Sequence, residues 1–193
     1  MVTHKEEKDS LFQRIKEQFE DIPEIYVTVY NFTQEASVDS LGELGLKPLA
    51  EGEGGSREKS NERLAGDLIF DKLAPKGFSR THSVYGYEDI SNLEHGSMGE
   101  GSILMEIKIN PKDALVADAD DSGEGLIAYR DGSVASAHEW AEQYWKRAIP
   151  LEEFLKLSPE EKKGRFYFPE VVIPHSIPPE HMRIAAVKLL QDR

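Results

Sequence analysis

Residues 103–109 carry an apolar side chain at every second position, and this alternation constrains the fold more than any other feature of the chain. The repeating residues are Ile103, Met105, Ile107 and Ile109. Side chains two residues apart lie on one face of a β-strand but on different faces of a helix. The segment therefore predicts a half-buried strand, which needs neighbouring strands and an apolar layer against one face.

Other segments predict short strands and helices that alternate along the chain. Strand patterns occur at 24–30, 83–87, 114–118 and 170–173, whereas 182–190 fits a strand or a helix. Three longer helices are predicted: an amphipathic one at 10–20, one at 64–73, and one at 136–148 in which Ser136 and Glu139 form a capping box. Two short helices are also predicted, one with Thr33 as its N-cap and Gly45 as its C′ residue, and one that starts at Ser158-Pro159. Residues 51–62 are predicted to be a loop, because they have no apolar periodicity.

The order of these elements predicts the fold class. Strands and helices are interleaved, but several of the short strands follow one another without a long crossover. This order favours an α+β fold with mixed, mainly antiparallel sheets and flanking helices over a doubly wound sheet. No internal repeat or break in composition divides the chain. We expect one domain over residues 1–193, in which residues 1–22 form an N-terminal amphipathic helix that precedes the core.

The charge and composition exclude several classes of function. The chain has 36 acidic and 23 basic residues, a net charge of −13, which disfavours non-specific binding to nucleic acid. It has no cysteine, so thiolate catalysis and thiolate metal sites are excluded. No apolar run approaches the roughly 18–20 residues that span a bilayer. We expect a cytoplasmic protein that has no membrane partner.

Two segments look superficially like metal sites. Residues 118–123 begin like a calcium-binding loop, but the twelfth position is Tyr129 rather than glutamate, which favours an acidic turn. His175 and His181 are separated by two prolines and do not have the spacing of zinc ligands. The sequence therefore predicts no metal cofactor.

The segments 26–48 (YVTVYNFTQEASVDSLGELGLKP) and 166–184 (FYFPEVVIPHSIPPEHMRI) carry the most specific motifs. They resemble the first and last motifs of the ADP-ribosyltransferase superfamily. In that family an early strand ends in an aromatic residue, His or Arg, any residue and Thr, and a late strand begins with Glu. Residues 83–91 (SVYGYEDIS) resemble the family's middle strand. The motifs are similar to those of the bacterial transferases of the family that act on DNA and RNA.

The resemblance implies transfer of ADP-ribose from NAD, with Glu170 as the catalytic carboxylate. Cleavage of the nicotinamide–ribose bond builds positive charge on the sugar, which a nearby carboxylate stabilises. Without the family motif, Glu170 would be interpreted as the first residue of a buried strand.

The resemblance also implies a cofactor site. Asn31 stands where the family has His or Arg, and an amide cannot carry charge. Thr33 would place a hydroxyl on the cofactor, although a helix cap explains it more simply. Arg80 is a candidate for the pyrophosphate, because guanidinium groups bind phosphate in bidentate fashion. Tyr85 and Tyr87 are two residues apart and therefore share one face of the predicted strand. Either ring could stack on nicotinamide or belong to the core.

Two main functions fit these features. The first is an NAD-dependent mono-ADP-ribosyltransferase-like protein with NAD as substrate and a protein or nucleic acid as acceptor. The second is an inactive module of the same fold that binds a nucleotide or a protein, which Asn31 favours. A third, transfer of an RNA 2′-phosphate, needs a basic groove that this acidic chain does not favour.

Overall fold

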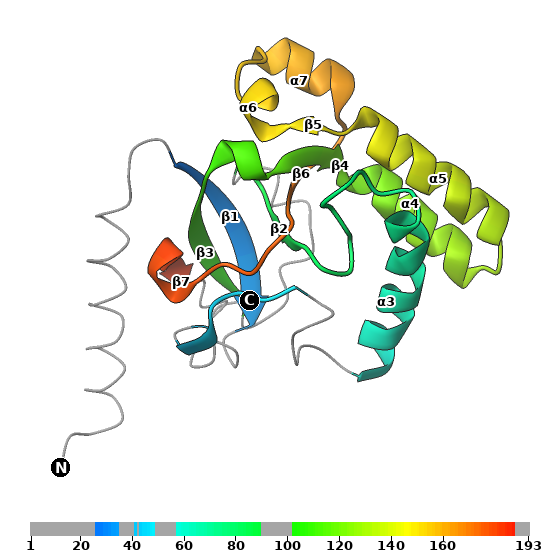
Figure 1. The fold of residues 1–193 in the computed structure, drawn as a ribbon, viewed down its shortest axis with the longest axis horizontal. Coiled ribbons are helices and arrows are strands. Elements are labelled where there is room, and N and C mark those ends of the chain that lie inside the picture. Colours follow the sequence, from blue (N-terminus) through cyan, green and yellow to red (C-terminus); the bar gives the residue numbers. More distant parts are fainter. Residues whose placement is uncertain (1–25, 35–40, 42, 49–56, 90–101, 188–193) are drawn as a thin grey trace, which may run out of the picture. The chain divides into compact units, whose positions relative to one another are not determined.

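The computed structural model describes residues 26–34, 41, 43–48, 57–89 and 102–187 (Figure 1). The chain is divided into two compact units, each assembled from separate segments. The first unit contains residues 1–46, 86–110 and 177–193, and the second contains residues 47–85 and 111–176. Antiparallel sheets and flanking helices give an α+β fold, as the order of elements predicts.

The first unit is built on a sheet of three antiparallel strands. Its order is β1 (Val27–Gln34), β3 (Ser102–Ile109) and β7 (Met182–Val187), so β3 is the central strand. The four alternating residues of the predicted strand are all buried, and Ile107 is 0% exposed. The prediction of a strand at 103–109 is confirmed, and of the segment 182–190, which fits a strand or a helix, the described part Met182–Val187 is a strand. The 3-10 turn η4 (Pro179–His181) leads into β7.

Strand β1 continues beyond its predicted end. Asn31 lies opposite Met105, and Thr33 lies opposite Ile103. The predictions that the strand ends at Tyr30 and that Thr33 caps a helix are therefore wrong. Pairing with the long central strand β3 satisfies the backbone groups as far as Gln34, which outweighs the local preference of threonine for a cap.

Gly45 ends a short helical segment in the first unit. Leu41, Glu43 and Leu44 are helical, and the Gly45 amide donates to the Leu41 carbonyl at 3.0 Å. Gly45 has φ +74°, so the prediction that it is the C′ residue is confirmed. The next residue, Leu46, exchanges two backbone hydrogen bonds of 2.8 Å with Ile177. This turn thus joins the start of the unit to its last segment.

We predict that Gly45→Ala destabilises the first unit by about 2–4 kcal/mol. A left-handed backbone costs an alanine about 1–2 kcal/mol, and forcing a methyl group into packed structure typically costs about 1–3 kcal/mol more. A Cβ at Gly45 would lie 2.1 Å from the Ile177 carbonyl oxygen, a backbone atom. Gly77→Ala is the matched control, because Gly77 has φ +90° but open space around it. Equal losses of stability in thermal unfolding of the two variants would contradict this reason.

The second unit contains a four-stranded sheet in the order β2 (Val84–Gly86), β6 (Pro169–Ile173), β4 (Leu115–Asp118) and β5 (Ile149–Pro150). Strand β4 pairs antiparallel with both β6 and β5. The other elements that the structure describes in this unit are three longer helices, two short helices and one 3-10 turn: α3 (Arg57–Asp71), α4 (Ala119–Arg130), α5 (Val134–Arg147), α6 (Leu151–Phe154), α7 (Pro159–Arg165) and η3 (Pro111–Asp113).

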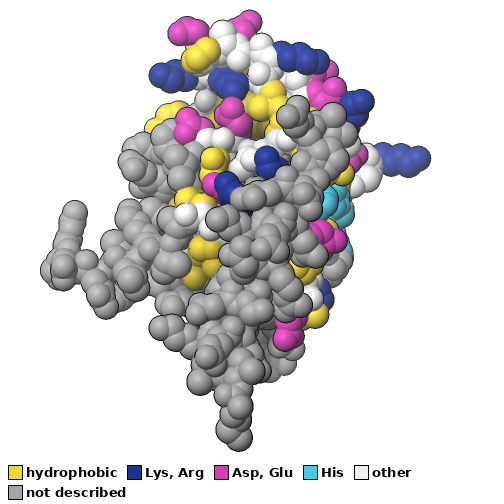
Figure 2. Space-filling model, turned by 90° about the vertical axis from the view of Figure 1, so that its left-hand side faces the viewer, with side chains coloured by type: hydrophobic (Ala, Val, Ile, Leu, Met, Phe, Trp, Pro, Cys, Tyr) yellow, Lys and Arg dark blue, Asp and Glu magenta, His cyan; other side chains and the backbone are white. Residues whose placement is uncertain are grey.

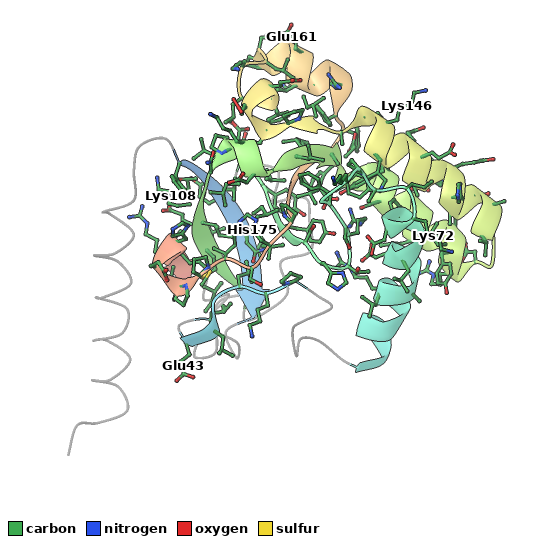
Figure 3. The ribbon with its side chains drawn as sticks, viewed as in Figure 1. Glu43, Lys72, Lys108, Lys146, Glu161 and His175 are labelled. Carbon is green, nitrogen blue, oxygen red and sulfur yellow. The ribbon has the colours of Figure 1, made fainter. Side chains whose placement is uncertain are left out.

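The core of this unit lies between the sheet and helices α3 and α5, where side chains fill the space between the ribbons (Figure 3). Phe70 and Tyr144 are 0% exposed, and their rings meet edge to face at 5.5 Å. The Trp145 indole donates to the Phe70 carbonyl at 2.8 Å, so a core aromatic also satisfies the end of α3. Val172 of β6 belongs to the same cluster of buried side chains and connects it to the sheet.

Three predicted boundaries in the second unit are wrong. Residues 57–62, predicted as a loop, belong to α3. Helix α5 has Ser133 as its N-cap, so Ser136 lies inside the helix and accepts a hydrogen bond from the Ser133 hydroxyl. Residues 118–123 are not an acidic turn, because Asp118 caps α4 and Asp121 is buried. For residues 118–123 the cause is tertiary, because Arg147 pairs with Asp118 and Asp121.

The short helix α7 follows its predicted sequence signals. Ser158 and Glu161 form a reciprocal capping box with Pro159 at the first helical position. Acidic residues occupy the first turn and basic residues the last, which complements the helix dipole. Both acidic and basic side chains are visible at the top of Figure 2.

Among the described residues, no helix combines the length and the apolar character needed to span a bilayer. The predicted helix at 10–20 and the rest of residues 1–22 lie outside the described part of the chain.

Candidate functional site

A buried arginine organises the centre of the second unit. The Arg80 side chain is 1% exposed and lies in the turn between α3 and β2. Its Nη1 donates to Glu170 Oε1 at 2.6 Å, and its Nε donates to Asp67 Oδ1 at 2.8 Å. Asp67 comes from α3 and Glu170 from β6, so one guanidinium joins a helix to the sheet.

Three aromatic rings surround the same guanidinium. Its central carbon lies 4.7 Å from the ring centre of Tyr85, 4.8 Å from that of Tyr144 and 5.4 Å from that of Phe70. Burial alone would lower the pKa of Arg80, but Glu170 and the other polar neighbours raise it, and the net pKa is above its ordinary value. Arg80 therefore stays charged, and charge-assisted hydrogen bonds hold both carboxylates.

Glu170 is held through one of its two carboxylate oxygens. Both the Arg80 Nη1 and the Tyr144 hydroxyl donate to Oε1, at 2.6 and 2.8 Å. No described residue donates a hydrogen bond to Oε2. The side chain is 5% exposed, and its backbone lies opposite Ala117 of β4. The carboxylate is therefore fixed in orientation, while its second oxygen keeps its capacity to accept.

The ionic cluster of Asp67, Arg80 and Glu170 has one more negative than positive charge. A further cation is Arg63, whose Nε lies 3.8 Å from Asp67 Oδ2. The Arg63 side chain is 53% exposed, so solvent screens its effect. Inside a protein an excess negative charge acts strongly, because the local dielectric constant is low. The cluster is thus suited to stabilise positive charge that develops next to Glu170 Oε2.

The two tyrosines of the site are kept neutral. Burial raises the pKa of Tyr144 well above its ordinary value of 10, and Glu170 adds to this, whereas Arg80 opposes it. Burial likewise raises the pKa of Tyr85, whose hydroxyl donates to the Arg80 carbonyl at 2.5 Å. Neutral phenols keep the proton that the Tyr144 hydrogen bond to Glu170 requires.

We predict that the second unit loses stability as the pH rises above about 10, the ordinary pKa of tyrosine. In the unfolded chain Tyr144 loses its proton near that pH, whereas in the folded chain it keeps it, so ionisation favours unfolding. Tyr144 alone contributes about 1.4 kcal/mol per pH unit above that point. Phenolate absorbance and circular dichroism should show that its ionisation coincides with unfolding.

Tyr144→Phe is the control for this titration, because it removes one phenol from the coupled step. Complete ionisation of all tyrosines in the still-folded wild-type protein would contradict the prediction.

Asp118 holds the backbone of the residues that precede Glu170. It is 0% exposed, and its carboxylate accepts from the backbone amides of Tyr167 and Phe168 at 2.7 and 2.8 Å. Arg147 donates to the same carboxylate at 3.0 Å. Asp118 thereby orders the two residues that precede Pro169-Glu170.

The structure brings together three of the six residues predicted for the site. Glu170, Arg80 and Tyr85 share the ionic cluster and its aromatic wall. Arg80 contacts two carboxylates and lies in the interior, rather than on a solvated loop. The other three lie in the first unit, where Asn31 and Thr33 belong to β1 and Tyr87 exchanges two backbone hydrogen bonds of 2.8 Å with Tyr30.

Sequence reasoning missed Asp67, Tyr144 and Asp118. Tyr144 lies in the predicted helix 136–148 and Asp67 in the predicted helix 64–73, and neither segment carries a motif that connects it with Glu170. A signal was present in Asp67, because an acidic residue three positions before the buried Phe70, on the same side of α3, is unusual unless it is paired. Its partner could not be identified from sequence spacing.

A concave region of the second unit shares no lining residue with the cluster of Asp67, Arg80 and Glu170. It is a hollow of about 630 Å³ over α5, from which Lys146 projects (Figure 3). Its lining mixes both signs of charge: Glu139, Glu142, Gln143, Lys146, Arg147 and Arg165. Among the residues that the structure describes, no group of three or more His, Asp or Glu side chains could hold a metal ion.

In comparisons with known proteins, the chain matches no family model, no curated protein and no solved structure.

Proposed function

We propose that the protein is an NAD-dependent mono-ADP-ribosyltransferase-like enzyme in which Glu170 is the catalytic carboxylate. Two independent observations support this. The sequence motifs at residues 26–48 and 166–184 resemble those of that superfamily. The side chains of Glu170, Arg80 and Tyr85, chosen from those motifs and their neighbours, share one cluster in the second unit.

The proposed reaction breaks the bond between the nicotinamide nitrogen and the ribose. Nicotinamide leaves with the electron pair of that bond, and positive charge develops on the sugar. The acceptor, a protein or nucleic-acid group or water, forms the new bond to the same carbon and releases a proton. Glu170 would stabilise the developing cation, and the reaction needs NAD as substrate and no metal.

The orientation of the Glu170 carboxylate is the observation that carries the proposal. Tyr144 and Arg80 both hold Oε1, and no described residue donates to Oε2. A carboxylate with one anchored and one available oxygen is preorganised to meet charge without moving. Arg80 then acts as a positioning residue for Glu170 rather than as the ligand of the pyrophosphate.

An inactive binding module of the same fold is the second candidate. The specific observation that favours it is the burial of Glu170, whose side chain is only 5% exposed and already paired with Arg80. A buried ion pair of this kind can serve to specify the fold alone. In this case the protein would bind a nucleotide or a partner protein and release no nicotinamide.

Binding and turnover of NAD by the wild-type protein separate the two candidates. At about 100 times its dissociation constant, NAD should add about 2.7 kcal/mol to the stability of the protein. The enzyme requires both a rise in melting temperature with NAD and the release of nicotinamide, measured by chromatography. A rise without release would favour the binding module, and no rise with either NAD or ADP-ribose would contradict the enzyme.

A further inference from the structure

Asp67 carries a buried charge that its described neighbours satisfy only in part. Its side chain is 1% exposed, and Oδ1 accepts a hydrogen bond from Arg80 Nε at 2.8 Å. Among the described residues, none donates a hydrogen bond to the other oxygen, Oδ2, which is itself buried. Arg63 Nε lies 3.8 Å from Oδ2, which is beyond hydrogen-bond distance. A buried carboxylate oxygen without a donor is costly, so the presence of this charge needs an explanation.

The Asp67 carboxylate affects how Arg80 meets Glu170. A guanidinium commonly binds one carboxylate through two parallel N–H groups. Here Arg80 divides its donors and gives Nε to Asp67 and Nη1 to Glu170 Oε1. Because Asp67 uses Nε, that side of the guanidinium cannot hold Glu170 in bidentate fashion. Glu170 receives a single N–H from Arg80, and its Oε2 keeps the capacity to accept.

Asp67 also prevents Arg80 from neutralising Glu170. One guanidinium and one carboxylate alone would form a neutral pair. Since Asp67 pairs with the same guanidinium, the three buried side chains together carry one net negative charge. In the low dielectric of a protein interior such a charge acts beyond the groups in direct contact with it. A neutral residue at position 67 would therefore weaken the negative potential at Glu170 Oε2.

We propose that Asp67 is a positioning residue for Glu170, and that it acts through Arg80 by directing the guanidinium and by offsetting its charge. The inference rests on the proposed transferase function, and the bonds broken and formed are those of that reaction. Nicotinamide leaves with the electron pair, and the ribose carbon becomes electron-poor. Glu170 stabilises that carbon directly, whereas Asp67 never touches the substrate and sets the orientation and net charge of the group that does.

The test replaces Asp67 with asparagine, whose amide oxygen can still accept from Arg80 Nε. Asp67→Asn should lower the rate of nicotinamide release at saturating NAD by about tenfold, which is less than the roughly 10²-fold effect of a group in direct contact. Its melting temperature should equal or exceed that of the wild type, because an unsatisfied neutral amide costs less than an unsatisfied carboxylate. The affinity for ADP-ribose, measured by calorimetry, should be unchanged.

Two matched variants separate this role from general effects of charge. Asp131→Asn removes an exposed carboxylate that lies 3.7 Å from Arg130 in the same unit, and it should change neither the rate nor the melting temperature. Arg63→Gln removes a charge of the opposite sign from beside Asp67 and should not lower the rate. A fall in rate in Arg63→Gln as large as that in Asp67→Asn would overturn the role given to the charge of Asp67.

A purely structural role for Asp67 predicts the opposite pattern. In that case Asp67→Asn would lower the melting temperature and leave the rate per folded molecule unchanged, and this result would overturn the inference. Wild-type activity in Asp67→Asn would do the same, while the activity of the wild type itself would leave the transferase function in place. If the wild type releases no nicotinamide, the proposed transferase function has failed, and the role of Asp67 fails with it.

Discussion

Replacing Arg80 with leucine should lower the free energy of unfolding of the second unit by about 3–5 kcal/mol, the usual cost of removing one partner from a buried ion pair. Arg80 is 1% exposed and holds Asp67 at 2.8 Å and Glu170 at 2.6 Å. Without the guanidinium Glu170 loses its cation and Asp67 keeps only the exposed Arg63 at 3.8 Å, and burial of a charge that is poorly paired is expensive. Urea unfolding followed by circular dichroism measures the loss.

Two further variants test the cause of this loss. Arg80→Lys keeps the charge but has no planar fork, so it can hold one carboxylate well and not both, and we expect an intermediate loss. A triple variant with Arg80→Met, Asp67→Leu and Glu170→Leu removes all three charges and should recover much of the stability, because apolar replacement of a buried ionic cluster is often neutral or favourable. An Arg80→Leu protein as stable as the wild type would show that the cluster does not hold the unit together.

Glu170→Gln should reduce nicotinamide release by about 10²–10³-fold, the typical effect of removing one preorganised stabilising group. The amide oxygen of glutamine can still accept from Tyr144 and Arg80, as Oε1 does in the wild type. The atom that replaces Oε2 becomes a neutral donor, so the variant loses the charge that faces the sugar and keeps its packing. Initial rates with saturating NAD give the comparison.

The control for this variant is its folding. Because the hydrogen bonds to Oε1 are conserved, the melting temperature of Glu170→Gln should lie close to that of the wild type. Loss of activity together with a large fall in melting temperature would assign Glu170 to structure and favour the binding module. Equal rates in variant and wild type would remove Glu170 from the chemistry.

Local signals predicted several features of this chain correctly, and the reason is the same for each. The strand at 103–109, the C′ residue Gly45 and the capping box of Ser158 and Glu161 depend on residues within a few positions of one another. Alternation, a left-handed backbone and a reciprocal cap are properties of a short stretch, so the order of residues is sufficient to reveal them.

Local signals were misleading where a distant partner decides the conformation. Thr33 has the preferences of a helix cap, but β3 supplies hydrogen-bond partners to the backbone of β1 beyond it. The acidic residues 118–121 resemble a solvated turn, yet Arg147 pairs with both Asp118 and Asp121. The energy of burial and pairing in these cases exceeds the small differences in local preference.

The sequence by itself determined that a glutamate would open a buried strand and that an arginine would precede another strand, which carries a tyrosine. Only the tertiary structure decided that they meet, because Glu170 finds Arg80 across 90 positions and Tyr144 across 26. Charges and hydroxyls act through space over a few ångströms, whereas a sequence pattern reports only the geometry of its own segment. The chemistry of this site therefore follows from how the sheet and helices of the second unit pack.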